Sequence, residues 1–303
     1  GDFESIRYLY EHNLSNIRYR HQVTFNSCEE IREFVQGEKK NPIYQGNMLT
    51  MGPLKLFKDG SLGARTAVVR APYEDDPGNY GVEATSDALQ EELCMEASKN
   101  GMQVITHVIG DGAIEKTINA YEKTMVNGEN TLRHSLVHCQ ITDKPLLERI
   151  AKLGILVQYQ PIFLDYDMHA VESRCGKALS STSYAFNTLD KLGGKISYGT
   201  DAPVEDCNPF PNIYSAVTRK DKTGWPEGGF YPEEKVDVYT AIDAYTTGSA
   251  YCEFMEDKKG RIKEGYLADF TVINQDIFTI KEEEIRDIDV HMTIVGGKVV
   301  YEE

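Results

Sequence analysis

Four residues with side chains that could ligate a metal or move a proton each fall near the end of a strand-like run. The runs are LKLFKD with Lys55, QVITH with His107, RHSLVH with His138 and KISYGTD with Asp201. In a barrel of parallel strands, reactive groups gather at the carboxyl ends of the strands. Four candidate ligands at four strand ends are therefore typical of a metal site.

Each of these residues also has a purely structural interpretation. A single histidine at a strand end is more often a satisfied structural residue than a ligand. Asp201 before Ala-Pro could cap a turn, and Lys55 could be an edge lysine that blocks association between sheets. The four residues together, in this order, favour a shared site.

Strand-like runs alternate along the chain with segments of helical period. NIRYRHQVTF precedes CEEIREFVQ, MQVITHV precedes a helix with Ile114 and Ile118 on one face, and RHSLVHCQ precedes TDKPLLERIAKLG. Such alternation implies parallel strands joined by right-handed crossovers. The sequence therefore predicts an α/β fold, either a barrel or an open doubly wound sheet. The absence of GxGxxG after a strand and of GxxxxGKS/T weakens the nucleotide-binding version.

Capping signals place two of the helices more closely. Ser86 is expected to be the N-cap of SDALQEELCMEASKN, and Gly101 its stop. Thr142 is expected to cap TDKPLLERIAKLG, with Gly154 just past the end.

Composition excludes several classes of partner. The formal charge of −16 over 303 residues argues against nucleic acid, which requires clustered Lys and Arg, and against an anionic membrane surface. No apolar run approaches the length of a bilayer span. The six cysteines are far apart with no CxxC spacing, so neither a zinc knuckle nor a disulfide framework is indicated, and a reducing cytoplasm is expected.

Five motifs resemble one known group of proteins. KLFKDGSLGARTA, THVIGDGAI, VHCQIT, YGTDAPVEDCNPF and GRIKEGYLADFTVIN are similar to the amidohydrolase superfamily, specifically the amidohydrolase 3 (YtcJ-like) metal-dependent hydrolases. The resemblance implies a (β/α)8 TIM barrel with one or two divalent metals, usually zinc, and a small β-sandwich. It also implies that Lys55 is a carboxylated metal ligand, that His107 and His138 are metal ligands, and that Asp201 is the catalytic acid.

The chemistry of such a site explains these residue types. An ammonium has no lone pair, but addition of carbon dioxide to Lys55 gives a carbamate whose oxygens can bind metal. Neutral imidazoles suit zinc. A bound metal lowers the pKa of water to about 7, so that a hydroxide can attack a carbonyl and Asp201 can pass the proton to a leaving amine.

The sequence departs from the group in its N-terminal part. The histidine-x-histidine pair of the first barrel strand is absent, and Val137 stands where the group usually has a glutamate. Counting from Lys55 as the fourth strand, the chain holds strands 3 to 8. Residues 1–258 are then a partial barrel, and residues 259–303 are the C-terminal strands of the β-sandwich.

Three further residues are candidates for binding substrate. Arg65 beside the barrel mouth could pair with a carboxylate, and Asp111 could contact substrate or stabilise a local turn. Residues 205–234 are expected to form a loop that serves as a lid, with Trp225 either facing substrate or packing the loop.

Two function classes stay open. The first is a hydrolase acting on an amide or other C–N bond of a small molecule, and the alternative is an inactive binding or regulatory protein. An incomplete barrel leaves two strands unpaired, so we expect closure by a separate N-terminal fragment or by a second copy in a homodimer. Alone, the chain is expected to be inert.

Overall fold

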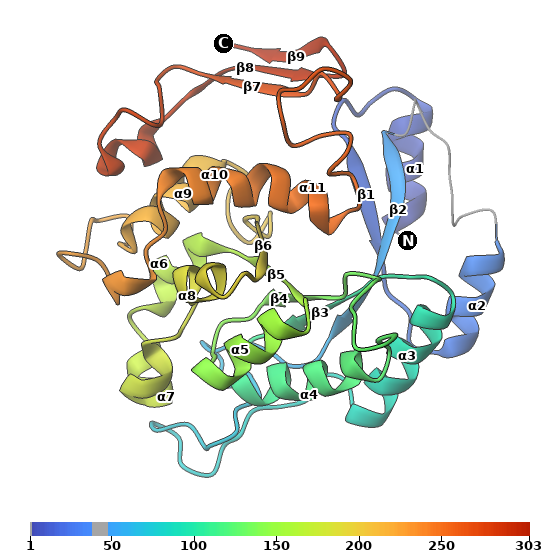
Figure 1. Cartoon of the computed structure of the whole chain (residues 1–303), viewed down its shortest axis with the longest axis vertical. Helices are drawn as coiled ribbons and strands as arrows, with labels where there is room; N and C mark the ends of the chain where they lie inside the picture. The colour runs from blue at the N-terminus through green and yellow to red at the C-terminus, as the bar shows by residue number, and fades with distance from the viewer. Residues whose placement is uncertain (1, 38–47) are drawn as a thin grey trace.

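Six parallel strands form the central sheet of the computed structural model, which describes residues 2–37 and 48–303 (Figure 1). Their order in the sheet is their order in the sequence. The strands are β1 (Tyr19–Val23), β2 (Leu49–Phe57), β3 (Val104–Val108), β4 (Ser135–His138), β5 (Leu156–Tyr159) and β6 (Lys195–Tyr198). This arrangement confirms the predicted α/β fold with parallel strands.

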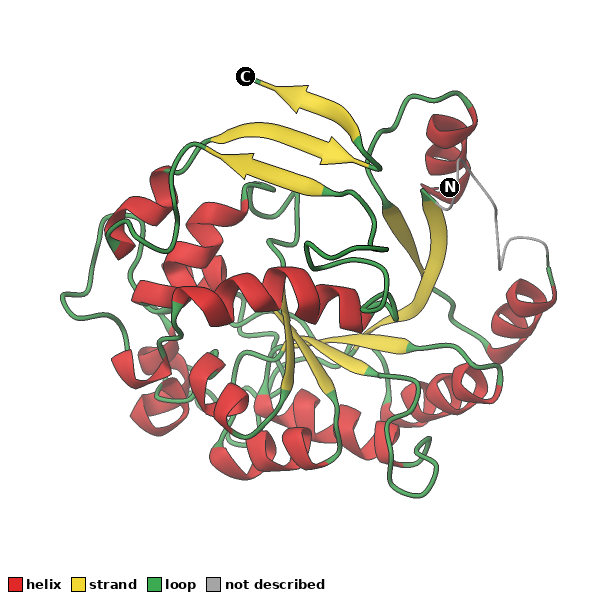
Figure 2. Cartoon of the chain, turned by 45° about the horizontal axis from the view of Figure 1, so that its top comes forward, coloured by secondary structure: helices red, strands yellow, loops and turns green. Residues whose placement is uncertain are grey.

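The sheet curls but does not close within the described residues. β1 and β6 stand at its two ends, each with a single strand neighbour. Figure 2 shows the strands fanned side by side, with helices covering their outer face. The architecture is an α/β half-barrel, consistent with the predicted incomplete TIM barrel.

Helices join the strands and cover the sheet. The α-helices are α1 (Asp2–Glu11), α2 (Cys28–Gln36), α3 (Asp87–Lys99), α4 (Asp111–Glu122), α5 (Lys144–Lys152), α6 (Leu164–Asp167), α7 (Val171–Ser180), α8 (Phe186–Lys191), α9 (Pro209–Thr218), α10 (Val238–Asp243) and α11 (Ser249–Cys252). Shorter turns are the 3-10 helices η2 (Pro161–Phe163), η3 (Pro232–Glu234) and η5 (Glu282–Asp287), and the π-helix η4 (Ala244–Gly248).

Strand alternation divides the side chains between a core and a hollow. Leu54, Leu56 and Val104 belong to the hydrophobic core between sheet and helices. Pro53 and Ile105, at the alternating positions, line a hollow of about 710 Å³ on the concave face. Because side chains alternate with a period of two, Lys55 and His107 also belong to the concave face.

The helix caps were predicted with one error. The side chain of Ser86 accepts the Leu89 N–H and caps α3, as expected. The prediction of Thr142 as the cap of α5 was wrong, because Asp143 accepts the Leu146 N–H there. Thr142 instead donates to the Thr182 carbonyl at 2.7 Å. Of these two adjacent residues, Asp143 therefore caps the helix and Thr142 binds a neighbouring loop.

The expected lid segment contains a buried helix. Asn208 caps α9 and Pro209 begins it, so the prediction of one long loop over residues 205–234 was wrong. Arg219 at the end of α9 is buried and donates to the carbonyls of Phe230, Tyr184 and Ser183. This arginine fastens the segment to the body of the protein.

A separate antiparallel sheet follows near the C-terminus (Figure 1). It comprises β7 (Phe270–Ile273), β8 (Val290–Val295) and β9 (Lys298–Glu302). Arg18 donates two hydrogen bonds, at 2.6 and 3.1 Å, to the carboxylate of Asp269, the residue just before β7. All three strands fall within residues 259–303, and the domain boundary at residue 258 stays a prediction. No helix among the described residues is long and apolar enough to cross a membrane.

Candidate active site

Lys55 and His107 come from neighbouring strands on the concave face. Lys55 pairs in register with Ile105, and Phe57 pairs with His107. Lys55 and His107 are therefore offset by two residues along the strands and lie on the same face of the sheet. Burial lowers the pKa of Lys55 to about 8, against the opposing charge of Asp201. Burial also lowers the pKa of His107, with Lys55 adding to the effect. Both side chains are therefore biased toward the neutral form, which has a lone pair.

His138 reaches the same place through a break in strand alternation. Leu136 and Cys139 both lie in the hydrophobic core, although a regular strand would put them on opposite faces. The backbone is left-handed at His138 (φ 71°) and Cys139 (φ 48°), a conformation that costs about 1–2 kcal/mol for a residue other than glycine. It turns the His138 ring toward His107, with ring centroids 4.6 Å apart.

Hydrogen bonds select one tautomer for each histidine. Gln160 donates through its amide nitrogen to the Gln158 carbonyl, so its Oε1 faces His138 Nδ1 at 2.6 Å. His107 Nε2 lies 2.8 Å from the Gly60 carbonyl. Both partners only accept, so His138 carries its proton on Nδ1 and His107 on Nε2. The free lone pairs are therefore at His138 Nε2 and His107 Nδ1.

Asp201 stands at the mouth of the half-barrel. It follows β6 in an exposed turn with φ 58°. Partial burial raises the pKa of its carboxyl, whereas the positive charges of Lys55 and His107 lower it. Asp201 thus interacts electrostatically with both residues.

The donor set fits a divalent metal in part. Burial lowers the pKa of His138 to about 3, so this imidazole is neutral at any ordinary pH and suits zinc. Within residues 2–37 and 48–303, no group of three or more His, Cys, Asp or Glu side chains is arranged to hold a metal. His107 and His138 provide two donors, and a third from Lys55 requires conversion of its amine to an anionic carbamate.

The remaining predicted site residues each have a protein partner. Arg65 makes a bidentate pair with Asp75 at 3.0 and 2.7 Å. Asp111 accepts from Arg70 Nε at 2.7 Å and begins helix α4. The Trp225 ring stacks on His169 at a centroid distance of 4.9 Å. A role of Arg65, Asp111 or Trp225 in binding substrate stays a prediction.

Sequence reasoning missed two residues that support the histidines. Gln160 follows strand β5 in the motif QYQP, which has no functional signal in the sequence. Its role is evident only from its position beside His138. Asp59 has no evident role in the sequence, yet it is buried and accepts three backbone N–H groups. Burial raises the pKa of Asp59 to about 7, against these three bonds and Lys58. Since all three partners are donors, they satisfy the ionised carboxylate.

The half-barrel and the histidines at its strand ends define an α/β protein with the architecture of a hydrolase barrel. The profile of the Amidohydrolase family matches residues 11–301, and the chain therefore belongs to this family. It is 38% identical over 257 residues to YtcJ of Bacillus subtilis (strain 168), named as an amidohydrolase, covering 85% of this chain and 48% of YtcJ.

Two further proteins are similar to the chain. The N-substituted formamide deformylase of Arthrobacter pascens is 25% identical over 262 residues, covering 84% of this chain and 46% of the deformylase. The crystal structure of an uncharacterized metal-dependent hydrolase from Pyrococcus horikoshii OT3 superposes with a TM-score of 0.80 and 27% identity, covering 92% of this chain and 55% of that one. These likenesses support a hydrolase function and a divalent metal. The chain spans about half the length of the relatives it matches.

Proposed function

We propose that this chain is part of a zinc-dependent hydrolase that cleaves an amide or other C–N bond of a small molecule. The observation that carries this proposal is the pair of neutral imidazoles, His107 and His138, whose hydrogen bonds leave one lone pair each. His107, His138 and a carbamate on Lys55 would hold the metal. When bound, the metal supplies Lewis acidity and a nucleophile at neutral pH.

The protein's own residues supply the proton transfer and the orientation of the ligands. Asp201, at the mouth, would accept the proton released by water and deliver it to the leaving amine. Gln160 holds the ring of His138 in the tautomer that can ligate. The relative from Arthrobacter pascens, a deformylase of N-substituted formamides, supports N-formyl and N-acyl amines as the first substrates to test.

The carbamate requires Lys55 to react as a free amine. Its Nζ lone pair would form a bond to the carbon of CO2, and loss of one proton to solvent leaves an anion. The lowered pKa of Lys55, about 8, gives a larger neutral fraction near neutral pH than an ordinary lysine has. In 13C-bicarbonate, we expect one carbamate resonance in the 13C spectrum, absent from Lys55→Arg. A spectrum without that resonance in the zinc-loaded protein would contradict the carbamate.

Turnover would need the barrel to be closed. β1 and β6 stand at the two ends of the sheet, each with one strand neighbour among the described residues, and the end strands of an open sheet recruit further strands. An N-terminal fragment of the same protein or a second copy would provide the missing strands. Light scattering distinguishes the two, because a self-closing chain is dimeric at micromolar concentration.

The function is tested by metal content and turnover on the closed protein. Elemental analysis should find zinc, and a panel of N-formyl and N-acyl amines should be hydrolysed. His138→Gln should lose both properties. A closed, folded protein that binds metal but hydrolyses no member of the panel would favour the inactive binding or regulatory protein.

A further inference from the structure

Asp59 joins two separate segments beside the histidine pair. It lies two residues past the end of strand β2, and its side chain is fully buried. Its Oδ2 accepts the N–H groups of Val68 and Gly110, both at 2.9 Å, and its Oδ1 accepts the Ile109 N–H at 3.0 Å. Val68 belongs to the loop after β2, and Ile109 and Gly110 immediately follow β3.

The residues on either side of Asp59 hold His107 at two points. The Lys58 N–H donates to the His107 carbonyl at 3.0 Å. The His107 ring donates from Nε2 to the Gly60 carbonyl at 2.8 Å. A Cβ on Gly60 would lie 2.1 Å from Thr66 Oγ1, so this close turn excludes a side chain. His107 is thus fixed at its backbone and at its ring by residues 58–60.

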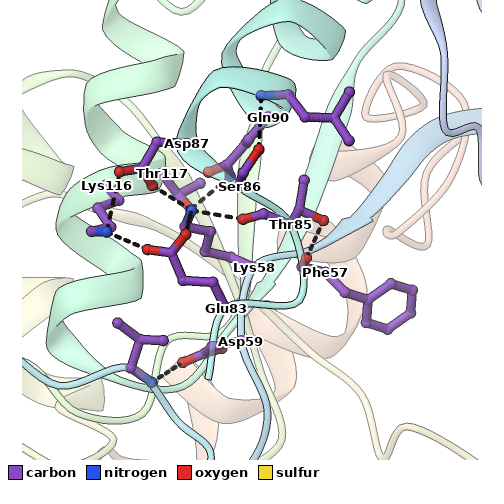
Figure 3. A network of polar contacts seen from close by, with 12 residues as sticks. Phe57, Lys58, Asp59, Glu83, Thr85, Ser86, Asp87, Gln90, Lys116 and Thr117 are labelled. Carbon is purple, nitrogen blue, oxygen red and sulfur yellow. Dashed lines mark hydrogen bonds and ion pairs between the residues drawn. The ribbon is translucent and has the colours of Figure 1, made fainter. Parts of the chain in front are cut away.

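Lys58 anchors the same segment on its other side. Its ammonium is fully buried and bonds to Glu83 at 3.2 Å, to the Thr85 carbonyl at 2.8 Å and to Asp87 at 2.5 Å (Figure 3). Lys116 bonds to both carboxylates from helix α4. Figure 3 shows Asp59 below this network. The backbone of residues 58–60 is therefore held by the side chain of Lys58 on one side and by that of Asp59 on the other.

We propose that Asp59 is a positioning residue that fixes the ring orientation and the tautomer of His107 through the carbonyl of Gly60. This inference rests on the proposed function only in taking His107 as a metal ligand. Asp59 is not a ligand in the proposed metal site, and its Oδ1 lies 3.6 Å from His107 Nε2, farther away than the Gly60 carbonyl at 2.8 Å. By binding Val68, Ile109 and Gly110, it sets the distance between the β2 turn and the end of β3, and this distance decides whether Nε2 reaches the Gly60 carbonyl.

Only a carboxylate satisfies the three amides. Each of its oxygens faces donors alone. An asparagine of the same size would direct its NH2 group at a backbone N–H, leaving at least one donor without a partner. We expect the β2 turn to move away from β3 in Asp59→Asn and the Gly60 carbonyl to release the imidazole.

The matched control is Asp165→Asn. Asp165 is also a buried carboxylate that accepts a backbone N–H, from Lys222 at 2.6 Å, and it pairs with the ammonium of Lys222. Among the described residues, Asp165 makes no hydrogen bond or ion pair with residues 58–60 or with His107. A general loss of stability should therefore appear in both variants, whereas a change at His107 should appear only in Asp59→Asn.

The experiment is long-range 1H–15N spectroscopy of the histidine rings in the metal-free chain, with His107→Gln used for assignment. We expect His107 to be one tautomer, protonated at Nε2, in the wild type and in Asp165→Asn, and a mixture of two tautomers in Asp59→Asn. An unchanged Nε2–H tautomer in Asp59→Asn, or an equal change in Asp165→Asn, would overturn the proposal.

Zinc titration provides the second readout. We expect Asp59→Asn to bind Zn2+ about 10- to 100-fold more weakly than the wild type, as is usual for residues that orient metal ligands. If the closed wild-type protein binds no Zn2+, the proposed function fails, and the tautomer result still decides the role of Asp59. Should Asp59→Asn not fold, the wild type decides: a His107 protonated at Nδ1, or fast exchange of the Val68, Ile109 and Gly110 amides, would overturn the proposal.

Discussion

The imidazole rings of His107 and His138 meet edge to face, with their centroids 4.6 Å apart. They come from adjacent parallel strands, and each ring is held by an acceptor that leaves its other nitrogen free. The positive charge of one would oppose protonation of the other, and the pKa of His138 is lowered by burial first and by His107 second. Both imidazoles are therefore biased toward the neutral form.

Replacing Gln160 tests the orientation of His138. Gln160→Leu removes the acceptor of the Nδ1 proton inside a buried site, so the ring loses its fixed tautomer. We expect the affinity for Zn2+, measured by calorimetry, to fall about 10- to 100-fold. Gln158→Leu is the matched control, because the Gln158 side chain bonds to Ser135 and not to His138. Equal losses in the two variants would show that Gln160 has no specific role.

Much of the fold was predictable because its signals are local. Ser86 caps a helix whose apolar residues have helical spacing, and the β-then-α alternation fixes a parallel sheet. Thr142 was mistaken for a cap because Asp143 beside it is equally suited. The helix α9 was missed because Asn208-Pro209 was counted as loop composition, whereas this pair is also a strong helix start.

His134 should make the protein sensitive to acid. Its Nδ1 accepts the Val104 N–H at 2.9 Å, and burial lowers its pKa to about 4. The unfolded chain protonates this histidine below about pH 6.5, whereas the folded chain does not until about pH 4, so stability falls as the pH decreases through this window. The loss over the whole window is about 3 kcal/mol.

Urea unfolding at pH 7 and pH 4.5 measures this contribution. His134→Gln should be less stable than the wild type at pH 7 but should lose about 2–3 kcal/mol less on acidification. The comparison isolates His134, because His107 and His138 are present in both proteins. Parallel pH dependences for the two proteins would contradict a buried neutral His134.

Arg219 and Trp225 should differ sharply in their effect on stability. Arg219→Met removes the donors that Arg219 directs at the buried carbonyls of Phe230, Tyr184 and Ser183. The Tyr184 carbonyl keeps the Phe186 N–H, and for the loss of the other bonds we expect a decrease of about 3 kcal/mol in the free energy of unfolding. Trp225 is 49% exposed and stacks on His169, so Trp225→Ala should cost about 1 kcal/mol. A larger loss for Trp225→Ala would assign this tryptophan to packing and weaken its predicted role at the substrate.

In the candidate site, only the residues proposed as ligands were predictable from the sequence. Lys55, His107 and His138 are residue types that can ligate a metal or move a proton, and their positions near strand ends were visible in the sequence. Asp59 and Gln160 are ordinary polar residues whose roles depend on tertiary contacts with Gly110 and His138. The left-handed backbone at His138, which re-aims its ring, has no sequence signal such as glycine.

Zinc titration of the 15N-labelled chain, followed at the histidine ring nitrogens in bicarbonate buffer, tests the metal site most directly. The structure leaves lone pairs at His107 Nδ1 and His138 Nε2, and we predict that these two resonances shift together on binding while the ring nitrogens of buried His134 do not. A folded chain in which Zn2+ leaves both resonances unchanged would contradict the assignment of His107 and His138 as metal ligands.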